Sequence, residues 1–113
     1  MFWQATAKQS EEATPLNESM ICAWANETFP SQPTRAIVEK LKKEVLELSV
    51  AFQNGKDITS EVGDIFIVLS QLARAVDTSV YQASALKMLI NLERTWEKQP
   101  DGTYQHVSEA SRH

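Results

Sequence analysis

Cysteine is almost absent from this sequence, since Cys22 is the single one among 113 residues. The chain therefore cannot form a disulfide within itself. A lone thiol is typical of proteins that work in a reducing compartment, and we expect a cytoplasmic location. Cys22 is most simply a small hydrophobic residue of the core.

The sequence also lacks a run of basic residues and a long run of apolar ones. The formal net charge is -4, which argues against a nucleic-acid partner, because a phosphate backbone is bound by clustered Lys and Arg. No apolar stretch approaches the roughly 20 residues that cross a membrane, and the N-terminal sequence lacks the pattern of a signal peptide. A small phosphate-bearing molecule is compatible with this charge, because metal ions can join it to an acidic protein.

Alternating strand patterns are absent as well, whereas apolar residues recur at helical spacing along most of the chain. The spacing predicts four helices, over about 14–29, 34–53, 59–76 and 79–98, separated by the prolines of 30–33 and by Asn54-Gly55. We predict an all-α fold, an antiparallel bundle of about four helices over residues 14–98. A polar N-terminal lead (1–13) and a polar C-terminal tail (99–113) flank it. A chain this small is expected to complete its core by oligomerisation.

The last three predicted helices each carry an apolar stripe that we expect to be buried. On the helix over 34–53 the stripe is Ile37, Leu41, Val45, Leu48 and Phe52. On the helix over 59–76 it is Val62, Ile65, Phe66, Leu69, Leu72, Ala73 and Val76. On the last helix it is Tyr81, Ala85, Met88, Leu89, Leu92 and Trp96.

Two pairs of carboxylates lie beside the stripes of the two middle helices. Glu44 and Glu47 are three positions apart, as are Glu61 and Asp64, so each pair shares a helix face. At about 100° per residue, all four lie between about 60° and 140° to the same side of the stripe centres. Antiparallel packing of these helices would gather four negative charges beside an apolar core.

Such a cluster is unfavourable unless a cation neutralises it, because like charges drive one another's protonation. Oxygen ligands suit Mg²⁺, with Mn²⁺ as a substitute, so the four acids are predicted metal ligands. Either pair alone has another interpretation, as solvated acids that pair with Lys40, Lys43 and similar neighbours. Gly63, inside the second pair, costs a helix about 1 kcal/mol relative to Ala. Its position indicates the close approach of a ligand or of a neighbouring helix.

The predicted last helix carries a second polar stripe, formed by Lys87, Asn91 and Arg94. Two cations and an amide on one face suit phosphate oxygens. The alternative is a basic surface near a helix C-terminus, where positive charge favours the helix dipole. His106 and His113 have no spacing partners, so we expect no catalytic part for either.

The order of these motifs resembles the MazG-like all-α nucleoside triphosphate pyrophosphohydrolases. The shared order is Glu-x-x-Glu, a short gap, Glu-x-x-Asp, and then Lys-x-x-x-Asn-x-x-Arg. Residues 24–29, 94–96 and 104–107 are similar to the dATP/dGTP branch of that family, and the resemblance spans about residues 20–107. Lys43 departs from the pattern, since many relatives carry a further acid there.

The resemblance implies Mg²⁺-dependent hydrolysis of dATP or dGTP to the monophosphate and pyrophosphate. It implies that the four acids hold the metal and that Glu47 is the general base for water. It also implies that the Lys-Asn-Arg stripe binds the phosphates or the sugar, and that Trp24 and Asn26 contact the base. The alternative for Trp24 is a plain core residue. Family members are usually homodimers or homotetramers. The alternatives are the same fold acting on dUTP, dCTP or a modified nucleotide, and a non-catalytic helical module for oligomerisation.

Overall fold

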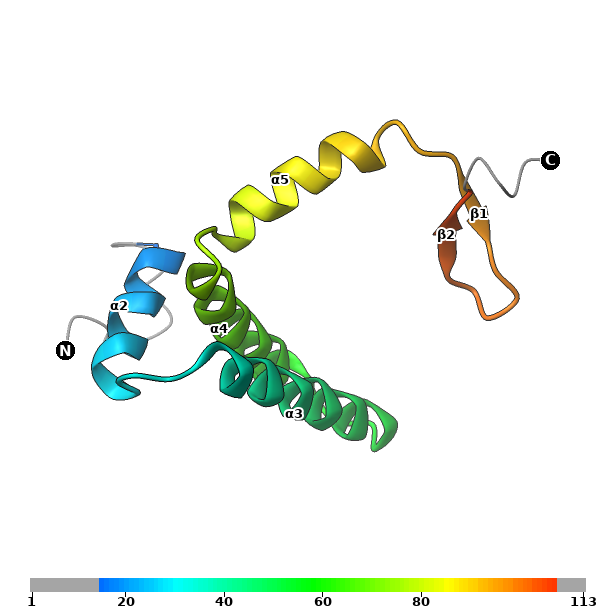
Figure 1. The fold of residues 1–113 in the computed structure, drawn as a ribbon. Helices are drawn as coiled ribbons and strands as arrows, with labels where there is room; N and C mark the ends of the chain where they lie inside the picture. Colours follow the sequence, from blue (N-terminus) through cyan, green and yellow to red (C-terminus); the bar gives the residue numbers. More distant parts are fainter. Residues whose placement is uncertain (1–14, 108–113) are drawn as a thin grey trace. The chain divides into compact units, whose positions relative to one another are not determined.

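The structure, a computed structural model, describes residues 15–107, which are mainly helical (Figure 1). The helices are α2 (Glu18–Thr28), α3 (Thr34–Gln53), α4 (Thr59–Ala75) and α5 (Val80–Asn91). Two short strands follow, β1 (Trp96–Lys98) and β2 (Tyr104–His106). The chain divides after Val80 into two units, which are described in turn. The predicted all-α fold of about four helices is confirmed.

Helix α2 begins at Glu18, later than the predicted start at Thr14 and Pro15. Asn17 is the N-cap, and its side chain accepts a hydrogen bond of 2.9 Å from the backbone N–H of Met20. Pro15 lies before the helix, and Thr14 is outside the described residues. The helix starts where an amide side chain satisfies a free N–H group, because this cap is stronger than the Thr-Pro signal.

Helices α3 and α4 form an antiparallel hairpin around the predicted Asn-Gly turn. Gly55 has a positive φ of 68°. The N–H groups of Lys56 and Gly55 donate to the carbonyls of Ala51 and Phe52, each at 3.0 Å. This is the pattern of a Schellman motif, which uses glycine to end a helix. The turn prediction is therefore confirmed, with its physical cause.

A side chain then starts α4 on the other side of the turn. Asp57 Oδ1 accepts hydrogen bonds from the backbone N–H of Thr59 at 3.0 Å and from its hydroxyl at 2.7 Å. These bonds hold the pKa of Asp57 below its ordinary value. The start of α4, and with it the position of the second acid pair, is thus fixed by local chemistry.

The core of this first unit is small and built largely from short side chains. Helix α4 packs against both α3 and α2. The buried apolar residues are Ile21, Cys22, Ala25, Ile37, Ala51, Val68 and Ala73. The thiol of Cys22 donates to the carbonyl of Ser70 at 3.4 Å, and burial raises the pKa of that thiol. Cys22 is therefore a core residue, as predicted.

The predicted stripe of α3 is wrong in part. The buried residues of α3 are Ile37, Glu44 and Ala51, each seven positions from the next. Val45 and Phe52 are 49% and 69% exposed. Helix α4 covers the line of α3 that contains Glu44. The apolar surface of α3 is wider than one neighbouring helix can bury, so Val45 and Phe52 stay exposed.

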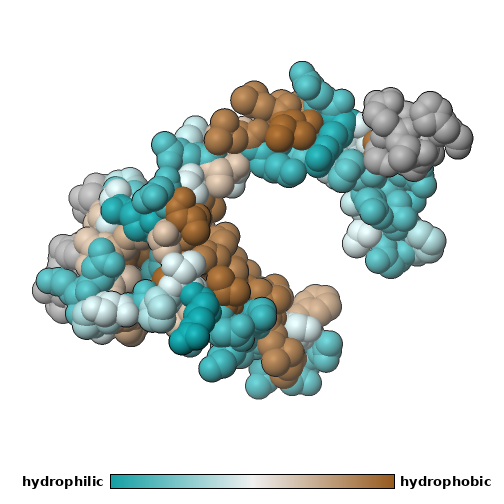
Figure 2. All heavy atoms as spheres, in the orientation of Figure 1, coloured by the Kyte–Doolittle hydropathy of each residue, from teal (hydrophilic) through white to brown (hydrophobic). Residues whose placement is uncertain are grey.

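A band of exposed apolar side chains is left along the α3–α4 hairpin (Figure 2). It consists of Val45, Leu46, Val50, Phe52, Val62 and Phe66. Val62 and Phe66 were predicted to be buried, and so was Val76, which is also exposed. Such a band on a small domain exceeds the scattered apolar residues of an ordinary surface.

The second unit contains most of α5 and a β-hairpin. Helix α5 ends at Asn91 and not near Lys98, and no residue of α5 is buried. The predicted buried stripe of this helix is therefore wrong within the described chain. Tyr81, Met88, Leu89 and Leu92 are all at least half exposed.

The hairpin was missed by the sequence analysis and spans the predicted boundary between residues 98 and 99. Trp96 pairs with His106, and Lys98 with Tyr104, in an antiparallel register. Gly102, with a φ of 92°, lies in the connecting turn. The imidazole of His106 meets the ring of Trp96 edge to face, with centroids 6.1 Å apart. His106 thus has a packing role, and His113 lies outside the described residues.

No helix within residues 15–107 is long and apolar enough to cross a membrane.

Candidate functional site

The two acid pairs lie in the α3–α4 hairpin at different depths. Glu44 faces α4 and is 5% exposed, whereas Glu47, one turn along α3, is exposed. Glu61 stands in the first turn of α4 and is half-buried, and Asp64 follows it on the exposed side. The periodicity predicted that all four acids flank the seam between the helices. In the structure, Glu44 lies inside this seam.

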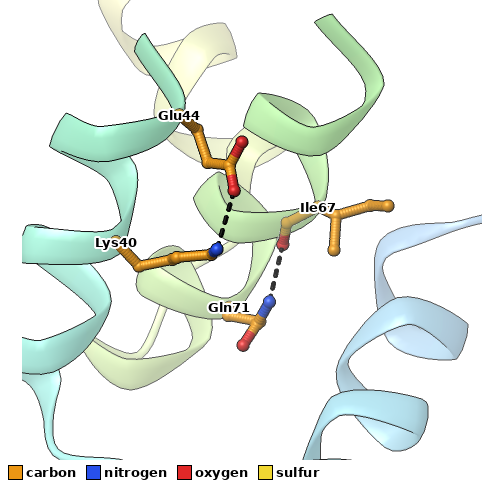
Figure 3. Close-up of polar contacts among 4 residues, drawn as sticks. All are labelled: Lys40, Glu44, Ile67 and Gln71. Carbon is orange, nitrogen blue, oxygen red and sulfur yellow. Dashed lines mark hydrogen bonds and ion pairs between the residues drawn. The ribbon is translucent and has the colours of Figure 1, made fainter. Parts of the chain in front are cut away.

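A lysine from the same helix neutralises the deepest acid (Figure 3). Lys40 Nζ lies 2.9 Å from Glu44 Oε1. The hydrogen bond from Lys40 holds the pKa of Glu44 below its ordinary value, against the effect of burial. Glu44 Oε2 is buried too and accepts no hydrogen bond from a donor group. The Glu47 carboxyl beside Glu44 could donate one only while protonated.

Glu47 and Asp64 belong to the same electrostatic cluster. The pKa of Glu47 is raised, first by its hydrogen bond with Glu44 and then by that carboxylate's charge, with a smaller contribution from Asp64. The pKa of Lys40 is raised, mainly by Glu44 and to a lesser extent by Glu47 and Asp64. Three of the predicted ligands therefore interact across the two helices.

Glu61 shares a groove with Glu47. Its Oε2 atom is buried without a hydrogen-bond partner. The groove, of about 440 Å³, is also lined by Lys56 and apolar residues of α3. Among the described residues, no three Asp, Glu, His or Cys side chains already form a metal-binding group. The roles of the four acids as metal ligands stay predictions.

A second hollow connects the deepest acid to an aromatic wall. A cavity of about 290 Å³ is lined by Glu44, Asp64 and Lys40 at its charged side. Trp24 and Phe29 also line it, with ring centroids 5.3 Å apart in an edge-to-face contact. One cavity thus contains two carboxylates and a flat aromatic surface.

Two glutamines line the same cavity and were missed by the sequence analysis. They are Gln32, before α3, and Gln71, on α4. Gln71 Nε2 donates to the backbone carbonyl of Ile67 at 3.3 Å (Figure 3). The Oε1 atom of the same amide is thereby oriented to act as a hydrogen-bond acceptor. A polar residue inside the apolar face of residues 65–73 was the signal for Gln71. Gln32 gave none, because it lies among prolines.

Asn26 lies beside an adjoining hollow and not in the cavity of Trp24. This hollow, of about 250 Å³, is lined by Asn26, Cys22 and Arg74 and shares Gln32 and Gln71 with the cavity described above. Trp24 and Asn26 therefore line neighbouring spaces that meet at the two glutamines.

Within residues 15–107, no atom lies close to the open side of Gly63. A Cβ atom at this position would meet no atom within 4 Å. The neighbouring-helix explanation of this glycine is therefore wrong within the described part of the chain. The other explanation, the approach of a ligand, stays a prediction.

The predicted phosphate-binding residues belong to the second unit. Lys87 and Asn91 lie on α5, but Arg94 follows the end of the helix, so the predicted single helical stripe is wrong for Arg94. Arg94 Nη1 donates to Asn91 Oδ1 at 3.5 Å. The indole N–H of Trp96 donates to the Asn91 carbonyl at 3.2 Å. A turn at residues 92–93 follows the helix, and the backbone N–H of Arg94 donates to the Asn91 carbonyl at 3.2 Å, which keeps Arg94 beside Asn91.

No family model matches the chain, but named phage proteins are similar to it. A dATP/dGTP diphosphohydrolase of Salmonella phage PMBT28 is 36% identical over 95 residues, which are 84% of this chain and 32% of that protein. The chain thus spans about a third of that relative's length. A dATP/dGTP diphosphohydrolase of Cyanophage S-2L is 29% identical over 90 residues, 80% of this chain and 84% of that protein.

Among solved structures, the chain is similar to the Cyanophage S-2L MazG-like pyrophosphohydrolase bound to dGDP and three catalytic Mn²⁺ ions per active site. It aligns with a TM-score of 0.69 and 25% identity, covering 93% of this chain and all of that chain. The helical fold is therefore the same in both proteins.

Proposed function

We propose that this chain is a MazG-like pyrophosphohydrolase, like the proteins it resembles, and that it hydrolyses a deoxynucleoside triphosphate to the monophosphate and pyrophosphate. The observation that carries the proposal is the cavity in which Glu44 and Asp64 face the same space as Trp24. Both named relatives are dATP/dGTP diphosphohydrolases, so we propose a purine deoxynucleotide as the substrate.

The acids fit divalent metal ions by their chemistry. All four offer carboxylate oxygens only, the ligands that hard cations such as Mg²⁺ prefer. The buried oxygens of Glu44 and Glu61 that lack hydrogen-bond donors are suited to a cation. We propose Glu44, Glu47, Glu61 and Asp64 as ligands of Mg²⁺, with Mn²⁺ as a substitute. When bound, such ions neutralise phosphate charge and lower the pKa of a bound water.

The cavity suggests an orientation for the nucleotide. Its carboxylates lie at one side, and Trp24, Gln32 and Gln71 offer a flat ring and amide groups to a base. Stacking on an aromatic ring accepts any base, whereas hydrogen bonds to amides distinguish them. We place the base against Trp24 and the phosphates toward the acids. Asn26, in the adjoining hollow, is a second candidate for contact with the base.

Glu47 is the proposed general base for the attacking water. The hydrogen bond with Glu44 and the charge of that carboxylate raise the pKa of Glu47, and a carboxylate at this position can accept a proton from a nearby water. Its exposure gives it access to water. The other acids are assigned to metal binding alone.

Lys87, Asn91 and Arg94 are proposed to bind the phosphates or the sugar. The contact between Arg94 and Asn91 limits the freedom of the guanidinium group. A guanidinium held in one orientation loses less entropy when it binds a phosphate by two hydrogen bonds. Lys87 would add a mobile point charge.

We propose that the chain forms a homodimer or homotetramer. The apolar band of the α3–α4 hairpin and the exposed apolar residues of α5 would be covered by further copies. An oligomer would also supply the core that this small chain does not build alone.

The decisive experiment is a panel of common NTPs and dNTPs with Mg²⁺, with pyrophosphate and single phosphate measured separately. We expect pyrophosphate release from dATP and dGTP, abolished in Glu47→Gln and in Asp64→Asn. The matched control is Glu39→Gln, an exposed acid of α3 that pairs with Lys42. Release from dUTP or dCTP instead would support the same fold with another substrate, and no release would support a non-catalytic module.

A further inference from the structure

The acid cluster contains its own cation. Lys40 Nζ lies 2.9 Å from Glu44 Oε1, and this lysine also interacts with Glu47 and Asp64 over longer distances. Within residues 15–80 as the structure describes them, no other basic group forms an ion pair with a predicted ligand. Helix α2 contains no Lys or Arg, and Arg74 of α4 lines the hollow of Cys22. Lys56 lines the groove of Glu47 and Glu61.

The two partners of this ion pair differ in depth. The Glu44 side chain is 6% exposed and the Lys40 side chain 52%. A buried carboxylate needs a positive partner, whereas a half-exposed ammonium can return to water at little cost. Lys40 has a flexible stem and binds as a point charge, without the two-pronged geometry of arginine. The ion pair can therefore break by movement of the Lys40 ammonium group into water, while Glu44 stays in place.

We propose that Lys40 is an internal competitor of the divalent metal, a positioning residue that holds Glu44 while the metal is absent and is displaced when it binds. The inference rests on the proposed function. A Mg²⁺ ion binds carboxylate oxygen at about 2.0–2.1 Å, and an ammonium group beside the same carboxylate would repel it. The displaced ammonium stays beside the cavity of Trp24, where a phosphate oxygen of the substrate is a suitable partner.

The test measures Mn²⁺ binding alone, without nucleotide, on the full chain. Lys40→Met removes the charge and keeps a similar length. Lys43→Met is the matched control, because it removes the same charge from the same helix next to Glu44 and Lys43 makes no ion pair. The dissociation constant is measured by electron paramagnetic resonance of free Mn²⁺ and by calorimetry.

We expect Lys40→Met to bind Mn²⁺ at least about threefold more tightly than the wild type, the equivalent of a weak ion pair. Lys43→Met should change the constant less than about twofold, and Lys40→Arg, which keeps the charge, should not tighten binding. With a chelator, Lys40→Met should lower the melting temperature, and Mn²⁺ should restore it. If Lys40→Met does not fold without metal, Lys40→Gln is measured in its place. It also removes the charge but keeps a hydrogen-bond donor for Glu44, and it should show the same gain in affinity.

Two results would overturn the inference. One is equal Mn²⁺ affinity in Lys40→Met and the wild type, and the other is an equal gain in Lys40→Met and Lys43→Met, which would indicate net charge alone. Because no nucleotide is present, the outcome is separable from that of the proposed function. A chain that binds Mn²⁺ in the expected order but releases no pyrophosphate would refute the enzyme and keep the competition. An active enzyme whose variants do not show the expected order of Mn²⁺ affinities would support the proposed function and refute the competition by Lys40.

Discussion

Glu44 is a charged group in the seam between two helices. Its replacement by leucine should stabilise the fold while removing a proposed metal ligand. It lies between Ile37 and Ala51 on the buried line of α3. Burying a leucine contributes about 1.5–3 kcal/mol relative to exposing it. The lost ion pair, with Lys40 half exposed, contributes about 0.2–1 kcal/mol, and the freed ammonium can enter water. Glu44→Leu should therefore raise the free energy of unfolding by about 1–2 kcal/mol in the absence of metal.

The assay is urea denaturation in a chelator, followed by the same titration with Mn²⁺. The wild type should gain stability from the ion by linkage, and Glu44→Leu should gain little, because a proposed ligand is gone. Glu39→Leu serves as the control, since Glu39 is exposed and its change should stay within about 0.5 kcal/mol. A chelator-treated Glu44→Leu variant that is less stable than the wild type would refute the reasoning about the seam.

Three further predictions concern single residues around the site. Gly63→Ala should raise the free energy of unfolding by about 1 kcal/mol in urea titrations, because the helix has open space there; a loss would reveal that something packs against this glycine in solution. Asp57→Asn should flatten the acid side of the profile of melting temperature against pH. The folded pKa of Asp57 is depressed, so its contribution is present above the unfolded value of about 3.9 and lost as the pH falls through the folded pKa. Trp24→Ala should raise KM for dATP and dGTP by about 10-fold or more with little change in kcat, as loss of one stacking surface does; steady-state pyrophosphate release checks it, and an unchanged KM would remove Trp24 from the site.

Local signals in the sequence were sufficient where local chemistry decides the structure. The end of α3 at Asn54-Gly55 is fixed by a left-handed glycine, and the start of α4 by the side chain of Asp57. Both depend on residues next to one another in the chain. The spacing of the acids likewise assigned each pair to one helix face.

Tertiary contacts decided what the sequence could not. Periodicity identified the apolar side of α3, but the line of contact with α4 runs through Glu44 and leaves Phe52 exposed. The β-hairpin was missed because each strand has three residues, too few for alternation to appear. A helix end at Asn91 gave no glycine or proline signal before Pro100.

The two interpretations of the acids offered by the sequence were posed as alternatives, a metal site or pairs with lysines. The structure contains features of both interpretations. Lys40 pairs with Glu44, and the same group of acids has carboxylate oxygens without hydrogen-bond partners among the described residues. Spacing alone cannot reveal this, since it contains no information on depth. Gln71 escaped notice for the same reason, because its amide matters only where α2 and α4 face one cavity.

The contact between Cys22 and Ser70 has a consequence for the evolution of selectivity. The contact between these short side chains limits how near α2 comes to α4. Each is followed within two positions by a residue that lines the cavity proposed to hold the nucleotide, Trp24 or Gln71. One added methylene at either position would spread the walls apart while leaving every group that faces them unchanged. Substitutions at two residues that do not contact a ligand could thus change the width of the cavity, and with it the size of the base accepted in the proposed function.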